Sequence, residues 1–298
     1  MRCRPLPRAG FSISEIGFGC MSLGRDNHEN YRLIQSAFEA GINYFDTADV
    51  YQNGWSEECL GAAVKTFRKE IRIATKVGNV ADPGGKSFNW CPSKSHILSS
   101  VDKSLKRLKT DYIDLYQLHG GTLNDNWDEI VETFDWLKQK GKILHYGISS
   151  IRPNVVRKIA GQPGWVSNML QYSLLDRRPE EELLNLLHEK EVGVLVRGAL
   201  AKGFLLNNKS SDYLNYSLQD VDLLKNKLEL FSIEKSLRLR LVLGWILNHK
   251  AVTSVVVGIR NSLQLTQLLE AMSLPRPEEK VYQKLSEVLP ANCYTDHR

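Results

Sequence analysis

The sequence predicts an α/β fold, an eight-stranded parallel (β/α)8 TIM barrel, on the strength of two observations. Eight short apolar runs alternate with longer segments in which apolar residues recur every three to four positions, the spacing of one buried helix face. Because parallel strands need crossover helices and are buried on both faces, eight such units close most naturally into a barrel. With 298 residues the chain exceeds the roughly 250 typical of this fold, so a single barrel domain over 1–298 is expected.

The strands are expected in chain order, each followed by a helix. The helical spacing is clear at Ile97, Val101, Leu105 and Leu108, among other segments. The eight predicted strands are Ile16–Gly19, Ile42–Asp46, Ile71–Lys76, Tyr112–His119, Ile143–Ser149, Val166–Gln171, Val192–Arg197 and Ser254–Gly258.

Four segments are left over from this alternation. They are the residues before Ile16, a loop over Gly78–Pro92, an insertion over Gly203–Ser232 and a tail with an extra helix over 273–298. Because the loop and the insertion follow strands, both should lie over the carboxyl-terminal end of the barrel, where ligands bind.

A doubly wound nucleotide-binding fold is the competing architecture, and its signature is Gly-x-Gly-x-x-Gly directly after the first strand. Here Gly17, Gly19 and Gly24 have a different spacing, and Ser22 occupies the third glycine position. The sequence therefore predicts that any dinucleotide is held in another way.

Composition and charge exclude several classes of function. The formal net charge is +5, but the densest basic group, Lys103 with Lys106, Arg107 and Lys109, falls on the polar side of a predicted helix, so no nucleic-acid partner is expected. The five cysteines are widely spaced and form no zinc-type pattern with the seven histidines, which predicts a metal-free protein in a reducing compartment. No apolar stretch approaches the roughly 18 residues of a membrane span, so no membrane partner and a cytoplasmic location are expected.

Polar residues close three successive predicted strands. Asp46 ends the second strand and Tyr51 follows it, while Lys76 ends the third strand and His119 the fourth. Since adjacent barrel strands bring their carboxyl ends together, these four side chains should form one cluster. Each has a simpler explanation when taken alone. Asp46 could cap the helix that begins near Ser56 while Tyr51 packs, Lys76 could reach solvent, and His119 could be a packing residue.

The motifs around these residues resemble the aldo-keto reductase family. The resemblance rests on Phe45-Asp46-Thr47-Ala48 with Tyr51, Ala74-Thr75-Lys76, Gln117-Leu118-His119 and Tyr146-Gly147-Ile148-Ser149, and it extends from about residue 10 to residue 272.

This resemblance implies four roles, each with a chemical reason. Hydride addition to a carbonyl leaves charge on its oxygen, so Tyr51 would donate a proton there. An isolated phenol has a pKa of about 10 and is a weak acid, so a neighbouring Lys76 ammonium would lower that pKa. Asp46 would keep Lys76 charged, and His119 would orient the carbonyl.

The resemblance also implies how a nicotinamide cofactor is held. Its carboxamide would contact Ser149, Asn168 and Gln171. Arg197 stands where many relatives carry a tyrosine that covers the nicotinamide, and it could stack there or point at the pyrophosphate. The segment Gly198–Gly203 resembles the pyrophosphate-binding loop of the family and supplies Gly198, Leu200 and Lys202.

The segment after the last predicted strand is typical of an anion site. Gly258 precedes a helix start at which Asn261 or Ser262 can act as cap, so backbone amides and the positive helix end face outward together. Arg260 could grip a 2'-phosphate, with Gln264 one turn into the helix, which favours NADPH over a more weakly bound NADH. Arg260 could also be a surface arginine at a helix start.

The expected function is NADPH-dependent reduction of an aldehyde or ketone, a small carbonyl substrate whose pocket Met21, Trp55 and Trp90 would line. Two other classes remain. A cofactor-sensing regulatory or binding subunit of the same fold would bind NADPH with little turnover. A phosphate-binding barrel with lyase or isomerase activity would leave Tyr51, Lys76 and His119 without roles. Neither the particular carbonyl compound nor an oligomeric partner is predicted.

Overall fold

Eight parallel strands form a closed barrel in a computed structural model of the chain, which describes residues 1–82, 87–207 and 210–298. The barrel strands are β3 (Ile16–Gly19), β4 (Tyr44–Asp46), β5 (Arg72–Val77), β8 (Ile113–Leu118), β9 (Ile143–Ser149), β10 (Trp165–Gln171), β11 (Gly193–Arg197) and β12 (Val252–Gly258). Around the barrel their order is β10-β11-β12-β3-β4-β5-β8-β9. Each predicted strand overlaps one of these, so the predicted fold class is confirmed.

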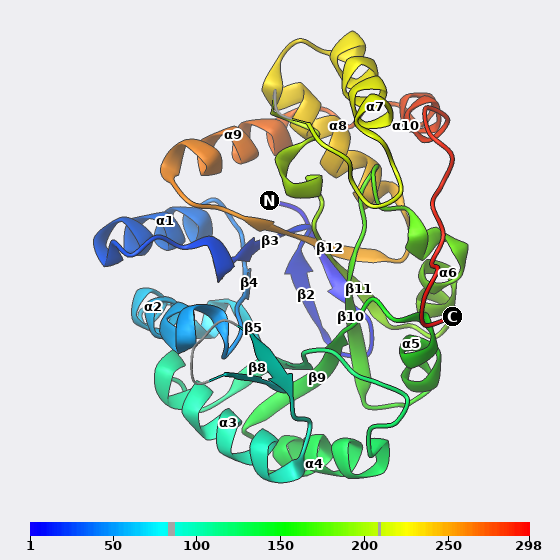
Figure 1. Cartoon of the computed structure of the whole chain (residues 1–298). Coiled ribbons are helices and arrows are strands. Elements are labelled where there is room, and N and C mark those ends of the chain that lie inside the picture. Colours follow the sequence, from blue (N-terminus) through cyan, green and yellow to red (C-terminus); the bar gives the residue numbers. More distant parts are fainter. Residues whose placement is uncertain (83–86, 208–209) are drawn as a thin grey trace.

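Helices cover the outside of the barrel (Figure 1). They are α1 (Asn27–Glu39), α2 (Trp55–Ala63), α3 (Lys94–Leu108), α4 (Trp127–Gln139), α5 (Pro153–Ala160), α6 (Leu183–Glu189), α7 (Leu218–Phe231), α8 (Lys235–Asn248), α9 (Ser262–Ser273) and α10 (Glu279–Ser286). In α3 the side chain of Ser93 accepts a hydrogen bond from the His96 N–H at the amino end, and Lys109 ends the helix in the left-handed conformation. In the described ranges, no helix combines the length and the apolar composition needed to cross a membrane.

The amino-terminal segment forms a hairpin that closes one end of the barrel. Strand β1 (Cys3–Leu6) pairs antiparallel with β2 (Phe11–Ser14), and Figure 1 shows the hairpin within the ring of strands. Leu6 and Ile13 are buried in one apolar cluster with residues of the barrel strands, among them Leu115 and Leu195. Because β2 runs directly into the start of β3, the hairpin closes the amino-terminal end and leaves the opposite end free for ligands.

The other leftover segments carry structure of their own. The Gly78–Pro92 loop contains a second hairpin, β6 (Asn79–Ala81) with β7 (Phe88–Trp90), while residues 83–86 lie outside the described residues. The Gly203–Ser232 insertion contains α7, and its residues 208–209 also lie outside the described residues. Helix α10 is the extra helix expected in the carboxyl-terminal tail.

One residue of the basic group on α3 departs from the expected solvated helix face. Arg107 donates a hydrogen bond of 2.6 Å to the fully buried carboxylate of Glu57 in α2, which also accepts one from the Thr75 hydroxyl of β5. Because a buried carboxylate is costly unless it is paired, Arg107 joins α2, α3 and β5.

Truncating the hairpin core should weaken the whole barrel. Ile13 is 0% exposed, so Ile13→Ala removes buried methyl groups and leaves a cavity, and the free energy of unfolding should fall by about 2–5 kcal/mol. The matched control is Ile233→Ala, since Ile233 is 89% exposed and should change stability by less than about 0.5 kcal/mol. Urea denaturation followed by circular dichroism measures both. Equal stability of the two variants would show that the hairpin is not part of the core.

Candidate active site

A cleft of about 1100 Å³ opens at the carboxyl-terminal end of the barrel strands. Residues at or just after the ends of seven strands contribute to its wall, namely Gly19, Asp46, His119, Ser149, Gln171, Arg197 and Gly258. In (β/α)8 barrels this is the end at which ligands bind and catalytic residues gather. The cleft is therefore the candidate active site.

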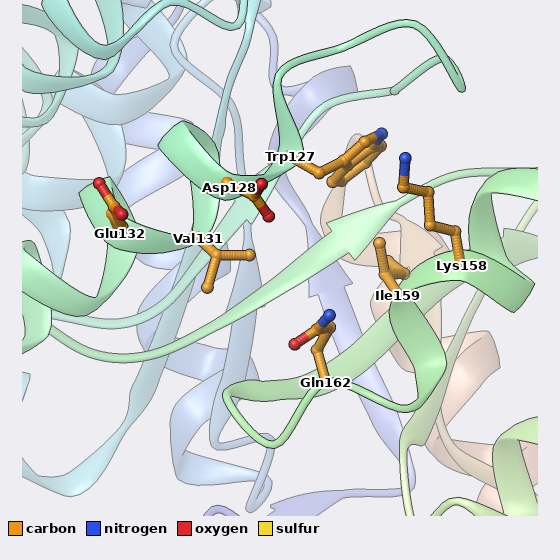
Figure 2. Close-up of a pocket in the computed structure, with 7 residues that line it drawn as sticks. All are labelled: Trp127, Asp128, Val131, Glu132, Lys158, Ile159 and Gln162. Carbon is orange, nitrogen blue, oxygen red and sulfur yellow. The ribbon is translucent and has the colours of Figure 1, made fainter.

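A second, smaller hollow of about 250 Å³ lies on the outside of the barrel between α4 and α5 (Figure 2). Figure 2 shows Asp128 and Glu132 on one helix and Lys158 on the other. All three side chains are exposed, so their charges are solvated. This hollow lacks the buried ionisable groups that distinguish the barrel cleft.

Tyr51 reaches the cleft through an irregular turn after β4. Gln52, Asn53 and Gly54 all have positive φ angles, of 52°, 58° and 86°, and this reverses the chain before α2 begins at Trp55. A Cβ atom on Gly54 would lie only 2.7 Å from the Arg107 side chain, so the turn needs glycine there. Gly54, not Asp46, is the N-cap of α2, and the alternative in which Asp46 caps this helix is wrong.

Asp46 and Lys76 form a buried ion pair beneath the cleft. The Lys76 Nζ atom lies 2.5 Å from Asp46 Oδ1 and also donates to the Thr47 carbonyl at 2.7 Å. The Lys76 side chain is only 1% exposed. Burial opposes the charge of the Lys76 ammonium, but the Asp46 carboxylate outweighs this and raises the pKa of Lys76. The ammonium is therefore held in the charged form.

The structure brings Tyr51 and His119 to this pair. Lys76 Nζ lies 5.1 Å from the centre of the Tyr51 ring, and the Tyr51 and His119 rings meet edge to face with their centres 6.0 Å apart. Tyr51, His119 and Asp46 line the cleft, while Lys76 lies below them. The four side chains predicted to cluster thus do so, with the phenol and the imidazole accessible and the ammonium covered.

His119 is an uncharged imidazole at neutral pH. Burial, reinforced by the positive charges of Lys76 and Arg197, lowers the pKa of His119 to about 3. A neutral imidazole can donate a hydrogen bond to a carbonyl oxygen, but it does not transfer a proton to that oxygen as an imidazolium could.

Gln117 is a site residue to which the sequence reasoning gave no role. Its Nε2 atom donates a 3.3 Å hydrogen bond to Asp46 Oδ2, the oxygen opposite the one that holds Lys76. The available signal is the two-residue period of a strand, since Gln117 precedes His119 by two positions and so shares its side of β8.

The residues predicted to hold a cofactor fall into two groups. Ser149, Gln171, Arg197, Gly198, Lys202 and Gly258 line the cleft, whereas Asn168, Leu200, Arg260, Ser262 and Gln264 do not. Asn168 is buried and donates a 3.3 Å hydrogen bond to the Ser150 carbonyl. Met169 and Gln171 face the cleft, and the alternation along β10 turns Asn168 away from it. The contact between Asn168 and the cofactor stays a prediction, and in the structure the residue supports the loop after β9.

The helix start after β12 contains the cap that the sequence left undecided between two residues. Asn261, not Ser262, is the N-cap, and its side chain accepts a 3.0 Å hydrogen bond from the Gln264 N–H. The Gln264 side chain in turn accepts one of 2.9 Å from the Arg260 N–H, so it stabilises the helix start. The Arg260 residue is exposed at this start.

Two of the three residues expected to line the substrate pocket lie in the cleft wall, and the third does not. Met21 and Trp90 line the cleft, together with Phe88, Ile151 and Tyr213. The Trp90 indole lies so close to Gly78 that a Cβ atom there would be 2.6 Å away, and its Nε1 atom donates to Asp125 at 3.0 Å. Trp55 is absent from the described cleft wall and packs against the core, with the Arg25 guanidinium 5.1 Å from its ring centre. Trp55 thus lies outside the described cleft wall, and its contact with a substrate stays a prediction.

Known proteins similar to this chain agree with the geometry. A sequence model described as the Aldo/keto reductase family matches residues 15–289. The chain is 43% identical over 312 residues to the oxidoreductase YqkF of Bacillus subtilis (strain 168), with 100% of both chains covered. It is also 29% identical over 302 residues to the probable aldo-keto reductase 1 of Glycine max, covering 94% of this chain and 87% of the relative. Among solved structures, the holo form of aldo-keto reductase AKR11C1 from Bacillus halodurans matches with a TM-score of 0.93 and 42% identity, covering 100% of this chain and 99% of that one.

Removing one member of the buried ion pair should cost more than removing both. Lys76→Met leaves the Asp46 carboxylate buried without its counterion, and the free energy of unfolding at pH 7 should fall by about 3–5 kcal/mol. The double variant Asp46→Leu with Lys76→Met removes both charges and should recover most of that loss. Denaturant titrations of the wild type and both variants test this. A double variant no more stable than the single one would contradict a compensated buried pair.

Proposed function

The chain belongs to the aldo/keto reductase family of oxidoreductases, and we propose that it reduces an aldehyde or ketone to an alcohol with NADPH, using Tyr51 as the general acid. The observation that carries this proposal is the charged Lys76 ammonium, held by Asp46 at 2.5 Å and lying 5.1 Å from the Tyr51 ring in a cleft shared with a neutral His119.

The proton transfer follows from the charges around Tyr51. The hydride would come from bound NADPH, and negative charge then develops on the carbonyl oxygen. A phenol is a reluctant donor at neutral pH, but a nearby ammonium stabilises the phenolate that remains after the proton has left. Asp46 keeps that ammonium charged, and Gln117 and the Thr47 carbonyl fix the pair from two other sides.

His119 would direct the carbonyl rather than protonate it. With its pKa lowered to about 3, the imidazole carries no proton that it could readily give up as an acid at neutral pH. A neutral N–H can still hydrogen-bond the oxygen and hold it near the Tyr51 hydroxyl. Tyr51 would therefore donate the proton, and His119 would orient the carbonyl group.

The cleft contains groups that fit a nicotinamide dinucleotide. Ser149 and Gln171 offer a hydroxyl and an amide suited to the carboxamide. Arg197 and Lys202 lie in the wall near Gly198, and neither has an acidic partner among the described residues, so both are available to a pyrophosphate. Gly198 has a φ of 71° and no side chain, which leaves its backbone accessible. The exposed Arg260 next to the α9 amino end would select the 2'-phosphate of NADPH, with NADH bound more weakly.

Replacing Tyr51 by Phe should remove the acid and leave the cleft intact. We expect kcat to fall by at least about 10²-fold while the Kd for NADPH stays within about twofold. Stopped-flow absorbance of NADPH with 4-nitrobenzaldehyde as probe, and fluorescence titration of NADPH, give the two quantities. Tyr31→Phe, at an exposed position of α1, is the matched control and should retain wild-type turnover. Unchanged kcat in the Tyr51 variant would remove Tyr51 as the acid.

A cofactor-sensing subunit would give another pattern in these assays. The wild type would then bind NADPH tightly, yet oxidise it with none of a panel of aldehydes and ketones.

Removing the Arg260 guanidinium should reduce the preference for NADPH. Arg260→Ala should raise the Kd for NADPH by about 10-fold or more, with little change for NADH, since only NADPH carries the 2'-phosphate. Titrating both cofactors into both proteins measures the ratio. The control is Arg157→Ala. Arg157 is a surface arginine of α5 that pairs with Glu182, and its replacement should change neither Kd. Equal weakening of the two cofactors by Arg260→Ala would exclude a 2'-phosphate contact.

A further inference from the structure

The cleft wall has an excess of positive charge. Among the described residues that line it, the basic side chains are Arg152, Arg197, Lys202 and His119, while Asp46 is the one carboxylate. Asp46 is already paired with Lys76, and His119 is neutral at physiological pH. No ion pair is formed within the described ranges by Arg152, Arg197 or Lys202. Two of these three cations are accounted for by the proposed pyrophosphate contacts, which leaves Arg152.

Arg152 is held in place at the side of the cleft that carries His119. It follows β9, the barrel neighbour of β8, and its Nη1 atom donates a 2.8 Å hydrogen bond to the carbonyl of Gly121, two residues beyond His119. A guanidinium has five N–H donors in a planar fork, and this bond uses one of them. The side chain is half-buried, so its orientation is restrained while part of it stays open to the cleft.

The carboxylate on the neighbouring loop, Asp125, forms no ion pair with Arg152 among the described residues. Asp125 accepts hydrogen bonds from the Trp90 indole at 3.0 Å, from the Thr122 N–H at 2.6 Å and from the Thr122 hydroxyl at 2.9 Å. These three hydrogen bonds hold the carboxylate against Trp90 and Thr122. The bonds also fix the Trp90 ring, which lines the same cleft as Arg152 and contributes an apolar surface with Phe88.

We propose that Arg152 is a substrate-specificity residue, and that the preferred substrate is an aldehyde or ketone carrying a carboxylate on an apolar spacer. This inference rests on the proposed reductase function and names its substrate class. A planar guanidinium matches a carboxylate in fork geometry, and a charge-assisted bond is stronger than a neutral one. The apolar wall of Trp90, Phe88 and Met21 suits the spacer, while the carbonyl group lies at Tyr51 and His119.

The test compares two aldehydes that differ by one carboxylate, benzaldehyde and 4-carboxybenzaldehyde. The wild type should show a kcat/KM about 10-fold higher for the carboxylate, expressed mainly in KM, and high salt should reduce the advantage. Arg152→Gln should abolish the difference and leave benzaldehyde within about twofold of wild type. Arg152→Lys keeps the charge and should retain part of the advantage. The matched control is Arg157→Gln. Arg157 lies within α5, five residues beyond Arg152, and its replacement should leave both activities as in the wild type.

Binding is measured separately by calorimetry of 4-carboxybenzaldehyde with wild type and Arg152→Gln. Binding that depends on Arg152, in a protein that turns over neither aldehyde, would support the carboxylate site and overturn the proposed reductase function. Turnover of both aldehydes with equal kcat/KM, unchanged by Arg152→Gln, would overturn the carboxylate site and support the function. Equal loss of both activities in Arg152→Gln would also overturn the carboxylate site, since Arg152 would then serve only to hold the Gly121 loop.

Discussion

The buried pair of Asp46 and Lys76 is the interaction on which the rest of the site depends. Taking two charges out of water is costly, and the cost is offset only when the geometry is close and the remaining polar atoms are satisfied. Here the barrel meets both conditions, because β4 and β5 are neighbours and place the two side chains 2.5 Å apart, while the Thr47 carbonyl and Gln117 bind their other sides. The Lys76 side chain is only 1% exposed, so little water screens the field of the ammonium on the side of Tyr51.

A second ion pair, between Glu57 and Arg107, lies on the helix side of β5. Successive residues of β5 point to opposite faces, so Lys76 faces the cleft while Thr75 faces the helices and donates to Glu57. Glu57 is paired in turn with Arg107, which packs against Gly54 in the turn that carries Tyr51. The position of the phenol is thus linked to α2, α3 and β5 through one network of charges.

The catalytic cluster at the strand ends could be predicted from the sequence. The contacts of most other residues around the cleft could not be predicted without the fold. Asp46, Lys76 and His119 close apolar runs, and the period of a strand together with the closure of a barrel is enough to bring such residues together. Asn168 has the expected residue type on the expected strand, but it lies outside the described cleft wall, so its contact with a cofactor stays a prediction. Trp55 and Gln264 make other contacts, with the Arg25 guanidinium and with the Arg260 N–H at a helix start, that the sequence does not indicate. Such competition between partners is decided in three dimensions and leaves no periodic signal.

The charge of the cleft is the clearest case of information that composition does not contain. The net charge of +5 is spread over interleaved helices, and the basic group that stands out in the sequence includes Arg107, which is already paired with Glu57. Three other cations, Arg152, Arg197 and Lys202, are separated along the chain and line one cleft beyond the ends of β9 and β11. Because low-dielectric walls concentrate their field and none of the three forms an ion pair within the described ranges, we expect these charges to attract anionic ligands more strongly than the surplus on the surface does. Recognition in this fold therefore depends on which charges the barrel leaves unpaired, and the net charge of the chain says little about it.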